Sequence, residues 1–101
     1  MSSPNNYELI ITDPARDDLG AISAYTFTKW GEEQSTKYTE ELYKTIVNIA
    51  NDPDTGKSRY GVPKVIKGRK SGRHVVFYRI IGQIIFIMRI LHESMDHGRH
   101  L

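Results

Sequence analysis

Two apolar runs near the C-terminal end dominate the pattern of hydrophobic and polar positions. Residues 74–81 (HVVFYRII) and 84–91 (IIFIMRIL) are separated only by Gly82-Gln83. Valine, isoleucine, phenylalanine and tyrosine favour strands, and glycine as the first central residue suits a type II′ turn. The pattern therefore predicts a β-hairpin. Both of its faces are mostly apolar, so we expect it to lie in the middle of the domain.

The predicted hairpin implies a register and leaves a few charged exceptions. We expect Ile81 to pair with Ile84, which places three further pairs opposite one another: Phe77 with Met88, Val75 with Ile90, and Arg73 with His92. Five basic side chains interrupt the apolar strands and are the first candidates for ion pairs or for function: Arg73, His74, Arg79, Arg89 and His92.

The first half of the chain predicts two helices joined by a single glycine. Apolar residues recur at three-to-four spacing before and after Gly31. Asp13 can cap the first free amides, and Pro14 suits the first helical position of a helix that runs to Trp30. A second helix begins with Glu32-Glu33-Gln34 and ends at Asn51-Asp52-Pro53. One intervening residue favours an antiparallel helical hairpin.

Strands complete the expected fold. Residues 7–12 (YELIIT) predict a first strand, residues 63–67 a second, and residues 68–72 (GRKSG) a basic turn before the β-hairpin. Because both helices are amphipathic, they should pack on the sheet. We therefore expect an α+β fold of order β-α-α-β-β-β with a small, mainly antiparallel sheet. A single domain should span 1–101, with frayed residues 1–6 and a C-terminal tail at 93–101.

Composition narrows the class of protein. The chain has 101 residues and no cysteine, which excludes disulfides and thiolate chemistry. It lacks the basic start and apolar core of a signal peptide, and no apolar run reaches the roughly 18 residues of a membrane helix. We expect a cytoplasmic protein with no membrane partner. His92, His97 and His100 have no firm metal-ligand spacing, so we expect no metal and no other cofactor.

Charge is distributed unevenly along the chain, although the net charge is only +2. Residues 1–56 contain ten acids and four Lys/Arg residues, whereas residues 57–101 contain two acids and ten Lys/Arg residues. Such a basic half favours an anionic partner, either nucleic acid or an acidic protein segment. The alternative is that acidic helices pack beside a basic sheet. Arg79 and Arg89 would then pair with helix acids, for which the candidates are Asp17, Asp18, Glu40 and Glu41.

Three stretches resemble one known family. They are residues 12–19 (TDPARDDL), residues 25–34 (YTFTKWGEEQ) and the C-terminal pattern R-I-L-H-x-x-M-D-x-x-R-H-L at 89–101. Together they are similar to ParE toxins of the RelE/ParE superfamily, which belong to type II toxin–antitoxin systems. The resemblance covers nearly the whole chain and implies the same helical hairpin on a small antiparallel sheet.

The resemblance also implies function and partners. The ParE branch implies inhibition of DNA gyrase and a block of replication, which requires no catalytic group in the toxin. It implies neutralisation by a cognate antitoxin, ParD-like or other, which binds through an otherwise disordered acidic C-terminal segment and forms a hetero-oligomer. The RelE branch implies ribosome-dependent cleavage of mRNA, and direct contact with nucleic acid is expected only there. A third alternative is an inactive relative that only binds antitoxin.

The two active alternatives make different use of the basic half. Ribonuclease chemistry needs an acid, a base and cations for the phosphorane, and Arg69, Arg73 and His92 are the candidates. Against it, Glu93 and Asp96 would repel a phosphate, and no tyrosine follows Tyr78.

Two sets of binding residues follow for the gyrase alternative. The target-binding candidates lie on the basic sheet region and the tail: Arg69, Lys70, Arg73, His92, Met95, Asp96, Arg99, His100 and Leu101. The antitoxin-binding candidates are mostly other cations: Lys57, Arg59, Lys64, Lys67, Arg79, Arg89 and Trp30. His74 is expected to be a half-buried strand residue.

Overall fold

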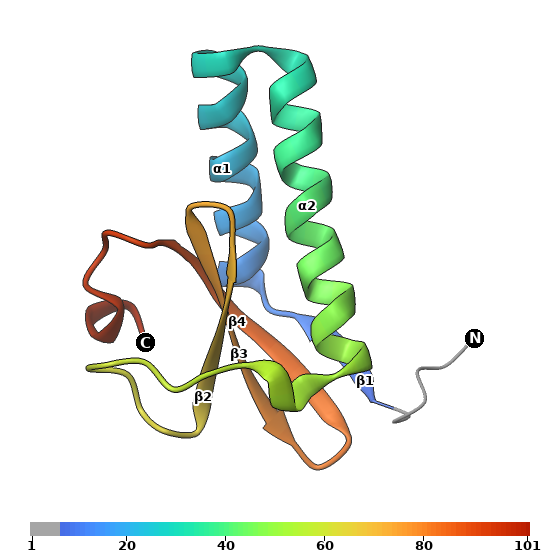
Figure 1. The fold of residues 1–101 in the computed structure, drawn as a ribbon, viewed down its shortest axis with the longest axis vertical. Helices are drawn as coiled ribbons and strands as arrows, with labels where there is room; N and C mark the ends of the chain where they lie inside the picture. Colours follow the sequence, from blue (N-terminus) through green and yellow to red (C-terminus); the bar gives the residue numbers. More distant parts are fainter. Residues whose placement is uncertain (1–6) are drawn as a thin grey trace.

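The structure, a computed structural model, describes residues 7–101, so the predicted fraying of residues 1–6 lies outside the described part. The elements follow the expected order (Figure 1): β1 (Glu8–Ile11), α1 (Asp13–Trp30), α2 (Glu32–Asn51), a 3₁₀ turn η1 (Pro53–Thr55), β2 (Ile66–Ser71), β3 (His74–Ile81), β4 (Ile84–His92) and a 3₁₀ turn η2 (His97–His100). Within this described part, neither helix has the length and apolar character needed to span a membrane.

The start of α1 is tied to the sheet by a residue that differs from the expected cap. Thr12, not Asp13, is the N-cap, and its Oγ1 accepts a hydrogen bond from the Ala15 amide at 3.4 Å. The same hydroxyl lies 2.7 Å from the Ile87 carbonyl of β4. Asp13 remains in the first helical turn, where the helix dipole favours an acid. Thr12 therefore both caps α1 and anchors it to β4.

The helices form the expected antiparallel hairpin. Gly31 separates them with φ +91°, a conformation that a side chain would strain. The sheet order is β1-β4-β3-β2, with β1 parallel to β4 and the other pairs antiparallel. The predicted α+β fold with a mainly antiparallel sheet is therefore confirmed.

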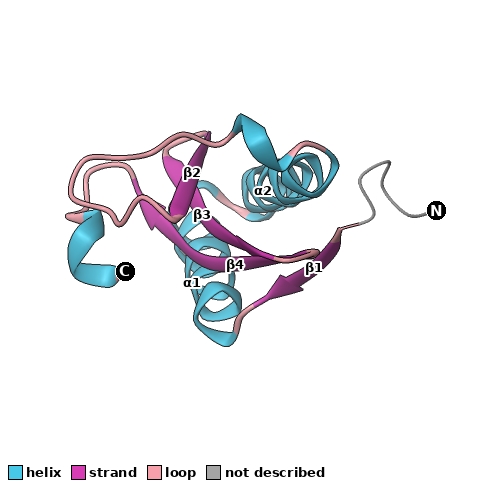
Figure 2. Ribbon diagram, turned by 90° about the horizontal axis from the view of Figure 1, so that it is seen from below, coloured by secondary structure: helices cyan, strands magenta, loops and turns pink. Residues whose placement is uncertain are grey.

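Two apolar clusters cover the two faces of the sheet. The larger one joins the helices to the strands through buried side chains: Ala15, Leu19, Ile22, Leu42, Ile46, Ile49, Val76, Tyr78, Ile85, Ile87 and Ile90. The second core lies on the other face and consists of Val62, Ile66, Val75, Phe77 and Leu91, with Leu101 packed against it. The loop at 56–65 and η2 lie at the same end of the sheet, away from β1 (Figure 2).

The hairpin register was predicted correctly only near the turn. Ile81 pairs with Ile84, and Gly82 has the positive φ (+60°) that the turn requires. A β-bulge between Tyr78 and Phe77 then shifts the pairing by one residue. Beyond it, the expected pairs are wrong, and the observed ones are Phe77 with Arg89, Val76 with Ile90, Val75 with Leu91, and His74 with His92.

The bulge decides which side chains face which core. It places Ile90 in the helix-facing cluster and Leu91 in the second core. Without the bulge, side chains that alternate from the turn would place these two residues on the opposite faces. His92 accordingly faces His74 rather than Arg73. The sequence could not locate the bulge, because residues 84–91 are apolar on both faces and show no alternation of apolar and polar residues that an extra residue would interrupt.

The second strand begins and ends later than predicted. It spans Ile66–Ser71, so Arg69 and Lys70 lie in a strand and not in a turn. The turn is instead at Gly72-Arg73, between β2 and β3. Gly68, which suggested a turn, lies within the strand, and a Cβ there would come within 2.9 Å of Val75 Cγ1. Its role is close packing against β3.

Candidate functional site

A polar cluster lies where the β2–β3 turn meets the side of α2. Tyr38 on α2 accepts a hydrogen bond from the Arg73 amide at 2.9 Å, and its hydroxyl lies 2.6 Å from His74 Nδ1. Gly72, with φ +58°, lets the Tyr38 ring approach, since a Cβ there would lie 2.8 Å from the ring. One tyrosine hydroxyl therefore fixes the turn and orients the first residue of β3.

Two histidines pack edge to face beside this tyrosine. The rings of His74 and His92 have centroids 5.3 Å apart at an interplanar angle of 87°. The Ser94 amide donates to His92 Nδ1 at 3.1 Å, and the Ser94 hydroxyl lies 2.7 Å from the same nitrogen. Burial, and then the neighbouring His92, hold the pKa of His74 below its usual 6.5. His74 is half-buried, as predicted.

This lowered pKa predicts a pH dependence of folding. The unfolded chain binds a proton at His74 more readily than the folded chain, so stability is fully present above pH 6.5 and falls as pH drops below it. Urea unfolding at pH 7.5, 6.5 and 5.5 should show that His74→Gln reduces this loss, although it weakens the fold at every pH by removing the Tyr38 contact. Equal pH slopes for the two proteins would contradict the assignment.

A carboxylate holds the two cations at the edge of the cluster. Glu93 lies 3.3 Å from Lys70 Nζ and 3.8 Å from an Arg73 guanidinium nitrogen, and its amide donates to the Arg73 carbonyl at 2.8 Å. The hydrogen bond and charge of Lys70, followed by the charge of Arg73, lower the pKa of Glu93. An anion that approached between Lys70 and Arg73 would have to displace or repel this carboxylate.

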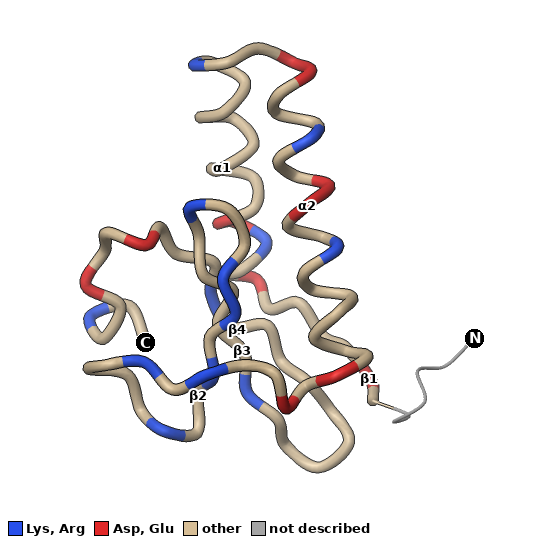
Figure 3. The backbone as a smooth tube through the Cα atoms, in the orientation of Figure 1, with Lys and Arg blue, Asp and Glu red and all other residues tan. Residues whose placement is uncertain are grey.

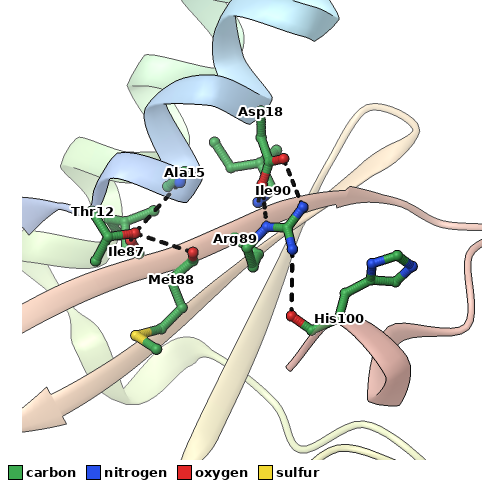
Figure 4. A network of polar contacts seen from close by, with 8 residues as sticks. All are labelled: Thr12, Ala15, Asp18, Ile87, Met88, Arg89, Ile90 and His100. Carbon is green, nitrogen blue, oxygen red and sulfur yellow. Dashed lines mark hydrogen bonds and ion pairs between the residues drawn. The ribbon is translucent and has the colours of Figure 1, made fainter.

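A second polar network joins α1, β4 and the tail (Figure 4). Arg89 donates to the Asp18 carboxylate through Nε at 2.8 Å and Nη2 at 2.9 Å, and to the His100 carbonyl at 3.4 Å. The Ile90 amide donates to the same carboxylate at 2.9 Å. The predicted pairing of Arg89 with a helix acid is thus confirmed, and Asp18 is the partner.

Comparison with known proteins assigns the family. The model of the ParE toxin of the type II toxin–antitoxin system parDE matches residues 9–97. The chain belongs to the ParE toxin family. Toxin ParE1 of Caulobacter vibrioides is 40% identical over 87 residues, covering 86% of this chain and 90% of that protein. Toxin ParE1 of Mycobacterium tuberculosis is 30% identical over 93 residues, covering 91% and 95%.

Solved structures of toxin–antitoxin complexes share the fold. A chain of the chromosomal ParDE system from P. aeruginosa superposes with a TM-score of 0.77 at 20% identity, over 87% of this chain and 97% of that one. A chain of the RelBE2 complex from Mycobacterium tuberculosis gives 0.62 at 18% identity, over 85% and 96%. The ParE family and the RelE/ParE-like fold expected from the sequence are therefore confirmed.

The structure gathers only part of the target-binding candidates of this ParE-family chain. Lys70, Arg73 and His92 lie together at the polar cluster. Arg69 points elsewhere, since its guanidinium donates to the Thr55 hydroxyl of η1 at 2.9 Å.

The tail candidates fold across the second core. Leu101 packs against that core, and the ring of His97, which was not a candidate, lies 4.9 Å from the Phe77 ring. His97 Nε2 also lies 2.9 Å from the His92 carbonyl. Exposed members remain available for contacts, including the Asp96–Arg99 pair at 3.9 Å and Met95.

The antitoxin-binding candidates are spread over several surfaces. Lys57, Lys64 and Arg79 are exposed, whereas Arg59 and Lys67 are half-buried. Figure 3 shows these cations on the loop and strands, while most acids lie on the helices, near η1 and in the tail. Trp30 lies at the tip of the helical hairpin, far along the chain from the others.

Sequence reasoning missed Tyr38 as a site residue. Its spacing on α2 matches the buried stripe, and its partly buried ring does pack against the main core. Only its hydroxyl distinguishes it from an ordinary core residue, and no local pattern reveals that the β2–β3 turn reaches it. Across residues 7–101, no group of three or more His, Asp or Glu side chains is arranged to hold a metal ion.

Proposed function

We propose that this chain inhibits DNA gyrase in the cytoplasm, blocks replication, and is neutralised by direct binding of a cognate antitoxin. Membership of the ParE toxin family is the observation that carries the proposal. Inhibition by binding requires a folded contact surface and no reacting group on the toxin. The exposed cations and the polar cluster at the end of the sheet supply such a surface.

The arrangement of the polar cluster supports gyrase over RNA as the target. A ribonuclease would need a cation free to stabilise the phosphorane beside an acid or base. Here Glu93 lies between Lys70 and Arg73. Arg69 is bonded to Thr55, away from His92. The three candidates for ribonuclease chemistry, Arg69, Arg73 and His92, are therefore not assembled around one position.

Expression without antitoxin distinguishes the possible functions. Inhibition of gyrase predicts cell filaments and a DNA-damage response while protein synthesis continues. Rapid arrest of translation with cut messages would instead establish the ribonuclease alternative, to which the structural likeness to the RelBE2 chain gives some support. Normal growth with folded, soluble protein would establish an inactive, antitoxin-binding relative and overturn the proposal.

Antitoxin binding should depend on salt. An acidic segment would gain electrostatic attraction from contact with four cations: Lys57, Lys64, Lys67 and Arg79. Salt screens this attraction beyond a distance of about 10 Å at 0.1 M ionic strength. Calorimetry with the cognate antitoxin should give a dissociation constant that rises roughly tenfold or more between 0.1 and 0.5 M NaCl. The Lys64→Ala/Arg79→Ala variant should show a smaller rise, and an affinity insensitive to salt would contradict this contact.

A further inference from the structure

A groove runs between the tip of the helical hairpin and the end of the sheet. It has a volume of about 750 Å³, within the range of ligand sites, and is bordered by nine residues: Tyr25, Thr26, Lys29, Trp30, Gln34, Tyr38, Arg73, His74 and His92. None of the nine is acidic. In Figure 1 the β2–β3 turn reaches toward the helical hairpin, below the α1–α2 tip.

The helical wall of the groove carries two exposed aromatic rings. Tyr25 is 63% exposed and Trp30 is 64% exposed, so neither ring is needed to fill the core. Lys29 Nζ lies 5.9 Å from the centroid of each ring. This wall thus offers two exposed aromatic rings with a cation close to both, a combination that suits flat, anionic ligands.

The sheet wall adds a second cation and polar groups. The Arg73 side chain is 79% exposed and makes only a long 3.8 Å contact with Glu93. His74 and His92, whose rings pack edge to face, also border the groove. Thr26 and Gln34 add side chains that can both donate and accept hydrogen bonds. Positive charge therefore borders both sides of the groove.

We propose that this groove binds single-stranded nucleic acid, with bases stacked on Trp30 and Tyr25 and phosphates near Lys29 and Arg73. Every base has a π-face, so such stacking tolerates any sequence, and basic groups follow the backbone. An amphipathic helix would bind through apolar anchors at helical spacing, whereas Trp30, Tyr25, Lys29 and Arg73 offer exposed ring faces and cations, which favour a flat anionic ligand. The proposal goes beyond gyrase inhibition, and beyond the expectation that only a ribonuclease would contact nucleic acid directly.

Trp30 provides the probe, because it is the only tryptophan in the chain. Titration of the purified protein with the oligonucleotide dT12 in 50 mM salt should quench its fluorescence. In anisotropy measurements with labelled dT12, Arg73→Ala and Trp30→Ala should each weaken binding roughly tenfold. The matched controls are Arg79→Ala, an exposed arginine at the other end of β3, and Tyr43→Ala, an exposed aromatic on α2. Both should bind within twofold of the unmodified protein.

Parallel titrations identify the source of the ligand. If dT12 binds more tightly than rU12, the ligand is DNA, and if rU12 binds more tightly, it is RNA. If thymidine monophosphate binds with the same affinity as dT12 expressed per nucleotide, the ligand is a free nucleotide. All three support the groove. The proposal is overturned if dT12 leaves Trp30 fluorescence unchanged, if Arg79→Ala weakens binding as much as Arg73→Ala, or if only an oligoglutamate peptide binds. Gyrase is absent from the assay, so its result is independent of the gyrase proposal.

Discussion

Replacing Asp18 by alanine is expected to lower the free energy of unfolding by about 3 kcal/mol. The carboxylate accepts three hydrogen bonds, two from the Arg89 guanidinium and one from the Ile90 amide. Its side chain is 15% exposed and that of Arg89 is 27% exposed, so the change leaves a largely buried cation and an amide without their acceptor. The guanidinium cannot avoid this cost by losing its proton, because an arginine side chain stays protonated in proteins. In the unmodified chain, the hydrogen bonds that Asp18 accepts raise the pKa of Arg89 further.

Urea unfolding followed by circular dichroism measures this loss. Asp17→Ala is the matched control, because Asp17 is the neighbouring acid and is exposed. It should change stability by no more than about 0.5 kcal/mol. Asp18→Asn should fall between the two, since an amide oxygen can still accept the bond from Ile90. A loss of under 1 kcal/mol in Asp18→Ala would show that the pair contributes little to the fold.

Removing residues 97–101 is expected to destabilise the chain by about 2–4 kcal/mol. Leu101 packs against the second core, and His97 stacks on Phe77, whose side chain is 0% exposed. Truncation would expose Phe77 and Leu91 to water. It would also remove the His100 carbonyl, which accepts a hydrogen bond from Arg89.

A point substitution separates this structural role from a role in target binding. Arg99→Ala removes an exposed charge whose nearest acid, Asp96, is 3.9 Å away. It should leave the free energy of unfolding unchanged within about 0.5 kcal/mol. If it nevertheless reduces growth inhibition, the tail contacts the target as well. Full stability of the truncated chain would contradict the packing role.

The helices were predictable because their ends carry local signals. Pro14 and Gly31 mark the limits of α1, and Pro53 marks the end of α2, so each boundary follows from a few neighbouring residues. The strands were less predictable, because their limits depend on partners far along the chain. Gly68 resembles a turn residue locally, but it lies within β2, where the Val75 side chain of β3 leaves no room for a Cβ. The position of the bulge at Phe77 likewise depends on packing against both faces of the sheet, by the helices on one face and by the second core on the other.

The candidate site was predictable in its charge but not in its geometry. The sequence predicts Lys70, Arg73 and His92 as members of a basic surface, and the structure places them together. It could not show that Glu93 lies between two of these cations, or that Tyr38 reaches the β2–β3 turn. Nor could it show that the exposed hairpin tip and the sheet border one groove, because these residues are separated by about half of the chain.

The central proposal is that this ParE-family chain acts on gyrase by binding. The most direct test measures supercoiling of relaxed plasmid by purified gyrase and ATP in the presence of increasing amounts of the purified protein. Supercoiling should decline with toxin concentration and recover when the cognate antitoxin is added beforehand. Supercoiling at an undiminished rate in excess toxin, together with cleavage of mRNA on translating ribosomes by the same preparation, would contradict the proposal.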